Sequence, residues 1–155
     1  MKRIILHLAT ILLLFAACDK NCLNLKEKPK NLKPIDWENY NDVNTVYWNL
    51  YSFEGEMVPV HTEIMVYGWV HYQDGISARG FTLVDDPNII LDTHGRPKID
   101  VENGFVELQA MFDTNYLTKR CFVKGKLFYS GITYGFCNII EPGIYVTDIN
   151  DIYFE

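Results

Sequence analysis

The stretch HTEIMVYGWVHYQ, residues 61–73, constrains the fold of this chain more than any other. One face of its alternation is apolar, with Ile64, Val66, Gly68 and Val70. The opposite face is rich in aromatic residues, with Tyr67, Trp69 and His71. Alternation with a period of two indicates a half-buried β-strand, and a glycine at its centre marks a bend or a close backbone approach.

Four further segments alternate in the same way and predict strands at residues 79–85, 104–112, 121–130 and 144–154. We expect a long polar loop over 85–103, a short connection at 113–119 and a loop that ends near Gly143. Before the strands, residues 36–53 carry apolar side chains at helical spacing. They predict a short helix with Asn41 or Asp42 as its N-cap.

The segments VYGWVHY, GFTLVDD, VELQAMF and FVKGKLF together resemble the oligonucleotide/oligosaccharide-binding (OB) fold over roughly residues 61–155. The resemblance implies a mainly β domain over 35–155, built as a five-stranded Greek-key barrel with a short helix before it. An immunoglobulin-like β-sandwich is the alternative, although it requires about seven strands.

The N-terminus has the composition of an export signal. Lys2 and Arg3 precede an apolar run over 4–15, which is shorter than the about 20 residues that a transmembrane helix needs. The run ends in Phe15-Ala16-Ala17-Cys18, which resembles the lipobox of bacterial lipoproteins, with Phe15 where Leu is commonest. The resemblance implies a signal peptide over 1–17 and a lipid on Cys18. A soluble secreted protein is the alternative.

Residues 18–34 predict a flexible tether because they combine five lysines with two prolines and no aromatic residue. The lysines suit contact with anionic head groups. The whole chain also resembles small envelope lipoproteins with one such domain after a lipobox. We therefore expect a lipid-anchored protein of the outer membrane that faces the periplasm.

The domain is strongly acidic. Residues 35–155 hold 18 Asp plus Glu against 7 Lys plus Arg, a formal charge of −11. Such a charge opposes a phosphate backbone, so we expect no nucleic-acid partner despite the OB resemblance.

The cysteines offer one candidate disulfide. Cys121 and Cys137 both lie in the domain, and an oxidising periplasm would favour their pairing. With Cys18 lipidated, Cys22 is left in the tether. The cysteine spacing includes no CxxC, so no zinc site is predicted.

The sequence offers no catalytic constellation and implies no cofactor. Asp92, His94 and Arg96 share one loop but are better explained as a solvated turn. The acidic run of Asp85, Asp86, Asn88 and Asp92 lacks the spacing of a calcium loop. An enzyme with an unrecognised site and a single-stranded nucleic-acid binder remain alternative functions.

The face of Tyr67, Trp69 and His71 is the candidate ligand site, because OB domains stack sugars or bases on exposed aromatic rings. The competing prediction is that Tyr47 and Trp48 pack over this face. We expect a monomeric, non-catalytic module that binds an envelope protein or a glycan.

Overall fold

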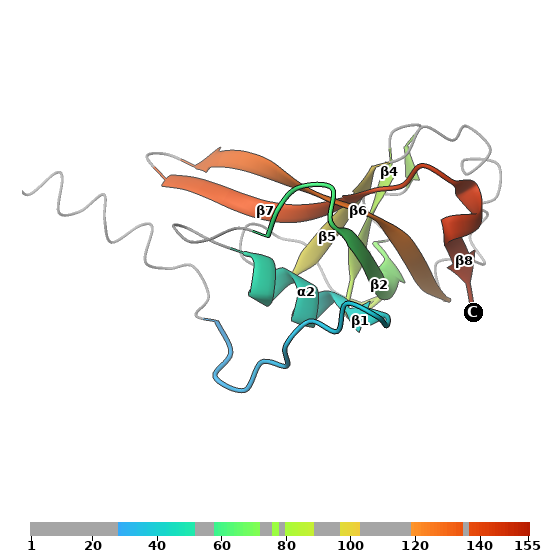
Figure 1. The fold of residues 1–155 in the computed structure, drawn as a ribbon, viewed down its shortest axis with the longest axis horizontal. Coiled ribbons are helices and arrows are strands. Elements are labelled where there is room, and N and C mark those ends of the chain that lie inside the picture. Colours follow the sequence, from blue (N-terminus) through green and yellow to red (C-terminus); the bar gives the residue numbers. More distant parts are fainter. Residues whose placement is uncertain are drawn as a thin grey trace, which may run out of the picture.

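The structure is a computed structural model that describes residues 28–51, 58–71, 76–77, 80–88, 97–102, 119–134 and 137–155. In these ranges the chain is mainly β (Figure 1), with the helix α2 (Val43–Leu50) and the 3-10 turn η2 (Ile149–Asp151). The strands are β1 (Asn41–Asp42), β2 (Glu63–Val70), β3 (Ile76–Ser77), β4 (Gly80–Val84), β5 (Lys98–Glu102), β6 (Arg120–Tyr134), β7 (Cys137–Tyr145) and β8 (Ile152–Phe154).

The eight strands of the described ranges form one mixed sheet. Its order is β1-β2-β4-β5-β7-β6-β8, and β3 pairs with β4. Because β2 also pairs with β6, the pairing returns to its start through five strands: β2, β4, β5, β7 and β6. Within this ring the β5–β7 pair is parallel, and the other pairs are antiparallel.

The helix forms where its cap and its apolar spacing predict it. Asp42 is the N-cap and accepts hydrogen bonds from Thr45 N at 2.8 Å and Thr45 Oγ1 at 2.9 Å. The apolar side chains of α2 then enter the core, which lies between the helix and the ring of strands. The core includes Val43, Val46, Ile64, Val66, Leu83, Ile99, Val101, Val123, Leu127 and Ile144.

Gly68 has no side chain because the helix and β4 leave no space for one. A Cβ atom there would lie 2.7 Å from Val43 Cγ2 and 2.6 Å from the Val84 carbonyl oxygen. The central glycine of β2 therefore permits the close approach that its position in the sequence predicted.

Three predicted strands overlap observed ones, since β2 and β4 lie within 61–73 and 79–85, and β6 (Arg120–Tyr134) contains 121–130. The prediction of a loop throughout 85–103 was wrong, because β5 occupies 98–102. The predicted loop before Gly143 was also wrong, because β7 begins at Cys137. The predicted last strand, 144–154, is instead the end of β7, then η2, then β8. The strand predicted at 104–112 lies outside the described residues.

The contacts of the domain begin inside the segment that we assigned to the tether. Leu32 packs against the core, and the Lys33 carbonyl oxygen accepts a hydrogen bond from Asn49 Nδ2 at 2.7 Å. Residues 1–27, including Cys18 and Cys22, lie outside the described residues.

Candidate functional site

Three aromatic rings stack on one another in a row on the outer face of β2, β6 and β8. Tyr67 pairs in register with Phe122, and Phe122 pairs with Tyr153. The ring centroids of Tyr67 and Phe122 are 5.6 Å apart, and those of Phe122 and Tyr153 are 4.8 Å apart, with interplanar angles of 29° and 4°. Residues directly opposite on neighbouring strands share one face, so the register itself builds this aromatic row of Tyr67, Phe122 and Tyr153.

Tyr40 contacts the aromatic row from the segment before the helix. Its ring meets Phe122 edge-on at 5.3 Å and Tyr153 edge-on at 6.0 Å. Burial, and then the neighbouring Tyr153, raise the pKa of Tyr40 to about 12. Tyr40 therefore stays a neutral hydrogen-bond donor at physiological pH.

The aromatic row is open to solvent in part. Tyr153 is 46% exposed, and Tyr40, Tyr67 and Phe122 are half-buried. The guanidinium carbon of Arg120 lies 5.6 Å from the centre of the Tyr67 ring. Because the three rings stack on one another and Arg120 lies over Tyr67, the surface combines apolar ring edges and the partly exposed ring of Tyr153 with a charged hydrogen-bond donor, a composition that suits sugar-like ligands.

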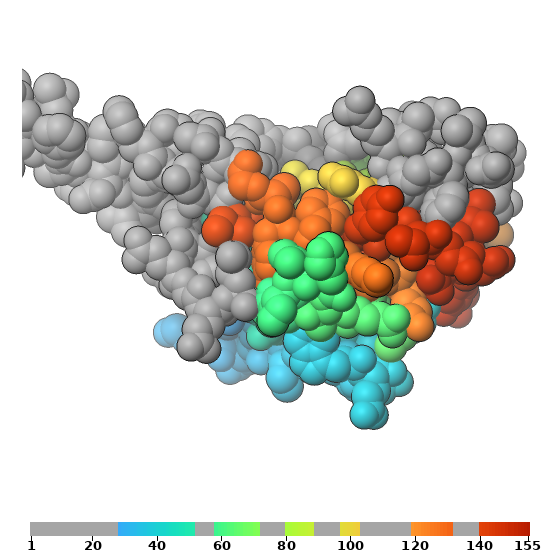
Figure 2. All heavy atoms as spheres, turned by 45° about the horizontal axis from the view of Figure 1, so that its top comes forward, coloured from blue at the N-terminus to red at the C-terminus, as the bar shows by residue number. Residues whose placement is uncertain are grey.

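A hollow of about 730 Å³ adjoins the aromatic row, and Tyr40 and Tyr67 line both. Its other lining residues come mainly from 33–45, which border the green residues 58–71 in Figure 2. Asp36, Glu38 and Asp42 make this lining acidic, and Lys33 is its one basic residue. Hydrogen bonds from Asn39 Nδ2 and Glu38 N lower the pKa of Asp36.

The predicted ligand face is only partly as expected. Tyr67 lies in the aromatic row, and Trp69 is half-buried opposite Arg120 on the same face. The placement of His71 on that face was wrong, because Val70 and His71 are both buried, at 1% exposure each. The alternation ends with β2 at Val70, and the His71 backbone N–H then donates to the Thr82 carbonyl oxygen at 2.9 Å.

The prediction that Tyr47 and Trp48 cover the aromatic face was wrong. Both are buried in the core, at 0% and 5% exposure. Tyr47 stacks on Tyr51 with centroids 4.9 Å apart, and Trp48 meets Tyr47 edge-on at 5.2 Å. The helix turns these rings into the core, and among the described residues of this segment Tyr40 supplies the ring that contacts the aromatic row.

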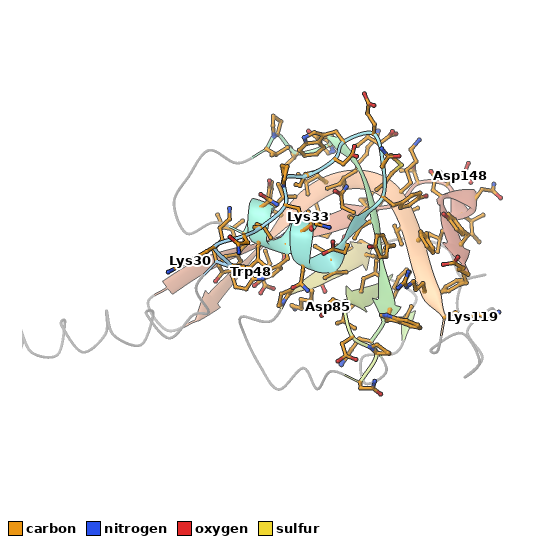
Figure 3. All side chains as sticks on the ribbon, turned by 90° about the horizontal axis from the view of Figure 1, so that it is seen from below. Lys30, Lys33, Trp48, Asp85, Lys119 and Asp148 are labelled. Carbon is orange, nitrogen blue, oxygen red and sulfur yellow. The ribbon has the colours of Figure 1, made fainter. Side chains whose placement is uncertain are left out.

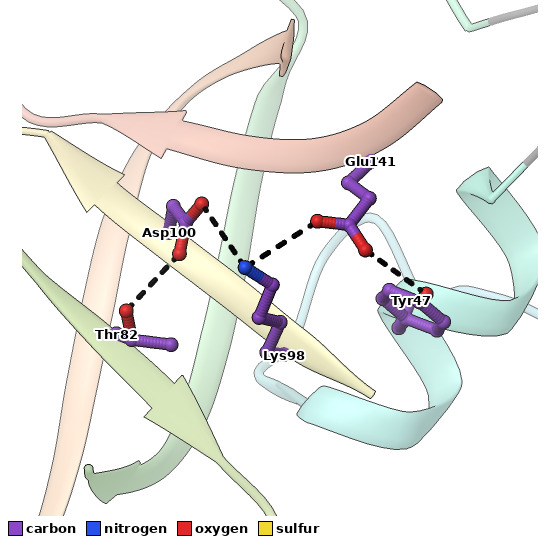
Figure 4. Close-up of polar contacts among 5 residues, drawn as sticks. All are labelled: Tyr47, Thr82, Lys98, Asp100 and Glu141. Carbon is purple, nitrogen blue, oxygen red and sulfur yellow. Dashed lines mark hydrogen bonds and ion pairs between the residues drawn. The ribbon is translucent and has the colours of Figure 1, made fainter. Parts of the chain in front are cut away.

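A second cluster joins the helix to β4, β5 and β7 (Figure 4). The Tyr47 hydroxyl donates to Glu141 Oε1 at 3.4 Å, and Lys98 Nζ lies 3.4 Å from Glu141 Oε2. The Lys98 ammonium is also 3.8 Å from Asp100, which accepts a hydrogen bond from Thr82 Oγ1 at 3.1 Å. Burial, and then the Glu141 carboxylate, raise the pKa of Tyr47.

This polar cluster fixes the position of the helix. Glu141 is 3% exposed, and its two oxygens face a phenol and an ammonium from different elements. Such buried pairs contribute little net stability but strongly disfavour loss of one partner. The cluster therefore specifies how α2 sits on the sheet, while the aromatic row remains the surface that solvent can reach.

The predicted disulfide does not form, because Cys121 is a free, fully buried thiol. Cys121 pairs with Phe154 near the start of β6, whereas Cys137 pairs with Tyr134 at the other end of that strand. At about 3.3 Å per residue the two positions are about 40 Å apart along the strand, far beyond disulfide reach. Burial raises the pKa of the Cys121 thiol.

The remaining candidate residues that the structure describes form no metal site. In the described part of the chain, no group of three His, Cys, Asp or Glu residues is arranged to hold a metal ion. Asn88 N and Nδ2 both donate to Asp86 Oδ1, as in a polar turn. Asp92, His94 and Arg96 lie outside the described residues. In the part of the chain that the structure describes, no helix is long and apolar enough to cross a membrane.

Sequence reasoning missed Tyr40, Arg120, Phe122 and Tyr153. The alternation of 121–130 did turn Phe122 outward, opposite to Val123. The signal that was lacking is the register, which alone brings Tyr67, Phe122 and Tyr153 together. No family model matches this chain, and neither curated proteins nor solved structures give a significant match.

Proposed function

We propose that this chain is a lipid-anchored envelope lipoprotein whose OB-like domain binds a glycan on the aromatic row. The observation that carries the ligand class is the set of in-register rings of Tyr67, Phe122 and Tyr153, which are partly exposed and lie beside Arg120. Sugar rings stack on flat aromatic faces while neighbouring polar groups bind their hydroxyls.

The strand connectivity supports an OB-like Greek-key barrel. In chain order the ring strands are β2, β4, β5, β6 and β7, and the fourth of them lies beside the first. The spatial order 4-1-2-3 is that of a Greek key. OB ligands commonly use the second and third strands, whereas the aromatic row lies on the first and fourth.

The anchor rests on the sequence Phe15-Ala16-Ala17-Cys18 after a short apolar run. A diacylglyceryl group on Cys18 with an acylated amine holds a protein on a bilayer stably, because two or more acyl chains are needed for that. The protein would then face the periplasm from the outer membrane as a monomer.

A glycan is favoured over a nucleic acid because of charge. The domain carries −11 overall, and the cations beside the aromatic row are already engaged by its own residues. Lys124 Nζ lies 3.2 Å from Glu63 Oε1, and Arg120 lies over the Tyr67 ring. We therefore expect no binding of single-stranded DNA at physiological salt.

Binding is favoured over catalysis because the aromatic row supplies a surface and not a reacting group. Its nearest charged residue, Arg120, can orient a ligand but cannot act as a base, since a guanidinium does not lose its proton in proteins. The Lys98 ammonium is held in ion pairs with the carboxylates of Asp100 and Glu141, at 3.8 and 3.4 Å.

An oligosaccharide microarray probed with the purified chain tests the proposal. Fluorescence titration with the best-binding oligosaccharide then compares Tyr153→Ala with Tyr145→Ala. The pair is matched, because both tyrosines are 46% exposed and only Tyr153 belongs to the aromatic row.

We expect Tyr153→Ala to weaken binding about 5- to 150-fold, since stacking contributes about 1 to 3 kcal/mol per ring. Tyr145→Ala should bind like the wild type. Equal affinities for the two variants would contradict the assignment of the site. Capture of an envelope protein that Tyr153→Ala abolishes, with no array signal, would replace the glycan by a protein ligand.

A further inference from the structure

The hollow beside the aromatic row has the size of a binding site of its own. Its volume of about 730 Å³ lies within the range of about 300 to 1,000 Å³ that small-molecule sites occupy. Tyr40 and Tyr67 line it, and the Tyr40 ring lies 6.0 Å from the partly exposed ring of Tyr153. One oligosaccharide can therefore contact Tyr153 and place a neighbouring unit in the hollow.

Trp37 is the largest side chain in the lining of the hollow. It is 44% exposed and is not part of the core. Within the described residues its indole makes no hydrogen bond and no contact with another ring. Tryptophan is among the residues that most often dominate binding interfaces, because its flat ring offers a large apolar area. The indole of Trp37 is therefore free to stack on a ligand in the hollow.

The segment that carries Trp37 is fixed before a ligand arrives. Asn41 is 6% exposed; its Nδ2 donates to the Asp36 carbonyl oxygen at 2.7 Å, and its Oδ1 accepts from Asp36 N at 2.9 Å. Asn49 Nδ2 of α2 donates to the Lys33 carbonyl oxygen at 2.7 Å. Figures 1 and 3 show this segment running past α2 before it reaches β1. Such a preformed wall lowers the ordering cost of binding.

The charge of the lining limits which sugars the hollow can accept. Three carboxylates, those of Asp36, Glu38 and Asp42, line it together with the single ammonium of Lys33. The carboxylates of Asp36 and Asp42 each accept two hydrogen bonds from neighbouring residues. The Glu38 side chain is exposed, and in the described part of the chain its carboxylate has no hydrogen bond or ion pair. Glu38 can therefore bind a ligand without losing an internal contact.

We infer that the hollow is a second sugar subsite, in which the Trp37 indole stacks on a sugar unit and the Glu38 carboxylate binds the free amino group of that unit. The inference rests on the proposed function, because the aromatic row binds the neighbouring unit of the same glycan. An ammonium group is attracted both by the carboxylate and by the faces of aromatic rings. The carboxylate of an acidic sugar would be repelled by the same lining.

Isothermal titration calorimetry of the purified chain with three oligosaccharides tests the charge preference. The ligands are the hexamers of glucosamine, of N-acetylglucosamine and of galacturonic acid, at about pH 6, where a primary amine is charged. We expect the glucosamine hexamer to bind most tightly and the galacturonic acid hexamer most weakly. Binding of the galacturonic acid hexamer that equals or exceeds that of the glucosamine hexamer would overturn the inference.

Two variants locate the subsite. Trp37→Ala should weaken binding of the glucosamine hexamer about 5- to 150-fold, the range for loss of one stacking ring. Tyr145→Ala, at a ring of similar exposure outside the lining, should bind like the wild type. Glu38→Gln should lower the ratio of glucosamine to N-acetylglucosamine affinity about 2- to 5-fold. Glu102→Gln, which is exposed but outside the lining, should leave this ratio unchanged. An unchanged ratio in Glu38→Gln would refute the contact with the amino group.

The same titrations distinguish the hollow from the aromatic row. If Tyr153→Ala weakens binding whereas Trp37→Ala and Glu38→Gln do not, the aromatic row stands and the hollow is refuted. If only the two hollow variants change binding, the hollow stands and the aromatic row is refuted. If no hexamer binds, both are refuted. A tetralysine peptide that binds as tightly as the glucosamine hexamer would also overturn the inference, since the hollow would then recognise the amino groups of a protein.

Discussion

Trp48 and Trp69 form a matched pair that tests which aromatic residues hold the domain together. Trp48 lies in the core at 5% exposure, where it meets Tyr47 and Tyr51 edge-on at 5.2 and 5.8 Å. Trp69 is half-buried on the outer face of β2, in register with Arg120. Alanine at each position therefore removes the same indole from two different environments.

The expected cost differs by several kcal/mol. Truncation of a buried tryptophan costs about 3 to 5 kcal/mol, of which the two edge-to-face contacts supply about 1 to 3. Trp69 is more exposed than Trp48 and lies on the outer face, where its truncation leaves no enclosed cavity, so this truncation should cost about 1 to 2 kcal/mol. At about 4 °C per kcal/mol, Trp48→Ala should lower Tm by about 12 to 20 °C and Trp69→Ala by about 4 to 8 °C.

Differential scanning calorimetry of the wild type and the two variants provides the assay. Agreement of the calorimetric and van't Hoff enthalpies shows that the comparison concerns a two-state transition. A Trp69→Ala loss equal to or larger than that of Trp48→Ala would refute the assignment of Trp48 to the core and Trp69 to the outer face.

Three further predictions concern the scaffold. Gly68→Ala should destabilise the domain by about 1 to 3 kcal/mol in urea unfolding, because the new Cβ meets Val84 and Val43; an unchanged midpoint would contradict the close approach. Asp42→Ala should cost about 1 kcal/mol by the same method, whereas Asp42→Asn, which keeps a capping oxygen, should cost less. The pKa of Tyr40 is raised from 10 to about 12, so the unfolded chain releases this proton first. Stability should therefore be complete below pH 10 and fall as the pH rises toward about 12. Tyr40→Phe should flatten that fall, and an unaltered pH profile would count against the buried phenol.

The sequence predicted those elements whose pattern is local. The alternation of 61–73 and the cap before Val43 locate β2 and α2, because each depends on neighbouring residues. The strand β5 was missed because Lys98, Asp100 and Glu102 point outward among turn-forming residues, so the segment looks polar. β7 was missed because Pro142 and Gly143 read as a turn, although Gly143 only makes room for the Phe128 ring.

The sequence predicted only part of the candidate site, for a similar reason. Tyr67 and Trp69 follow from the alternation of one strand, but the contact of Tyr67 with Phe122 depends on a register between strands more than fifty residues apart. The prediction for His71 was wrong because the alternation with a period of two holds only within β2, which ends at Val70. The wrong prediction that Tyr47 and Trp48 cover the aromatic face was based on the aromatic content of residues 36–53 alone. Such content does not show which side of the sheet the helix faces.

The central claim is that the outer face of β2, β6 and β8 is the ligand surface. Aromatic ¹H–¹³C NMR spectra of the domain, titrated with the best-binding oligosaccharide of the array, test it most directly. We predict shifts of the Tyr67, Phe122 and Tyr153 ring resonances that saturate with the ligand. Ring resonances of Tyr67, Phe122 and Tyr153 that stay unmoved at saturating oligosaccharide would contradict the claim.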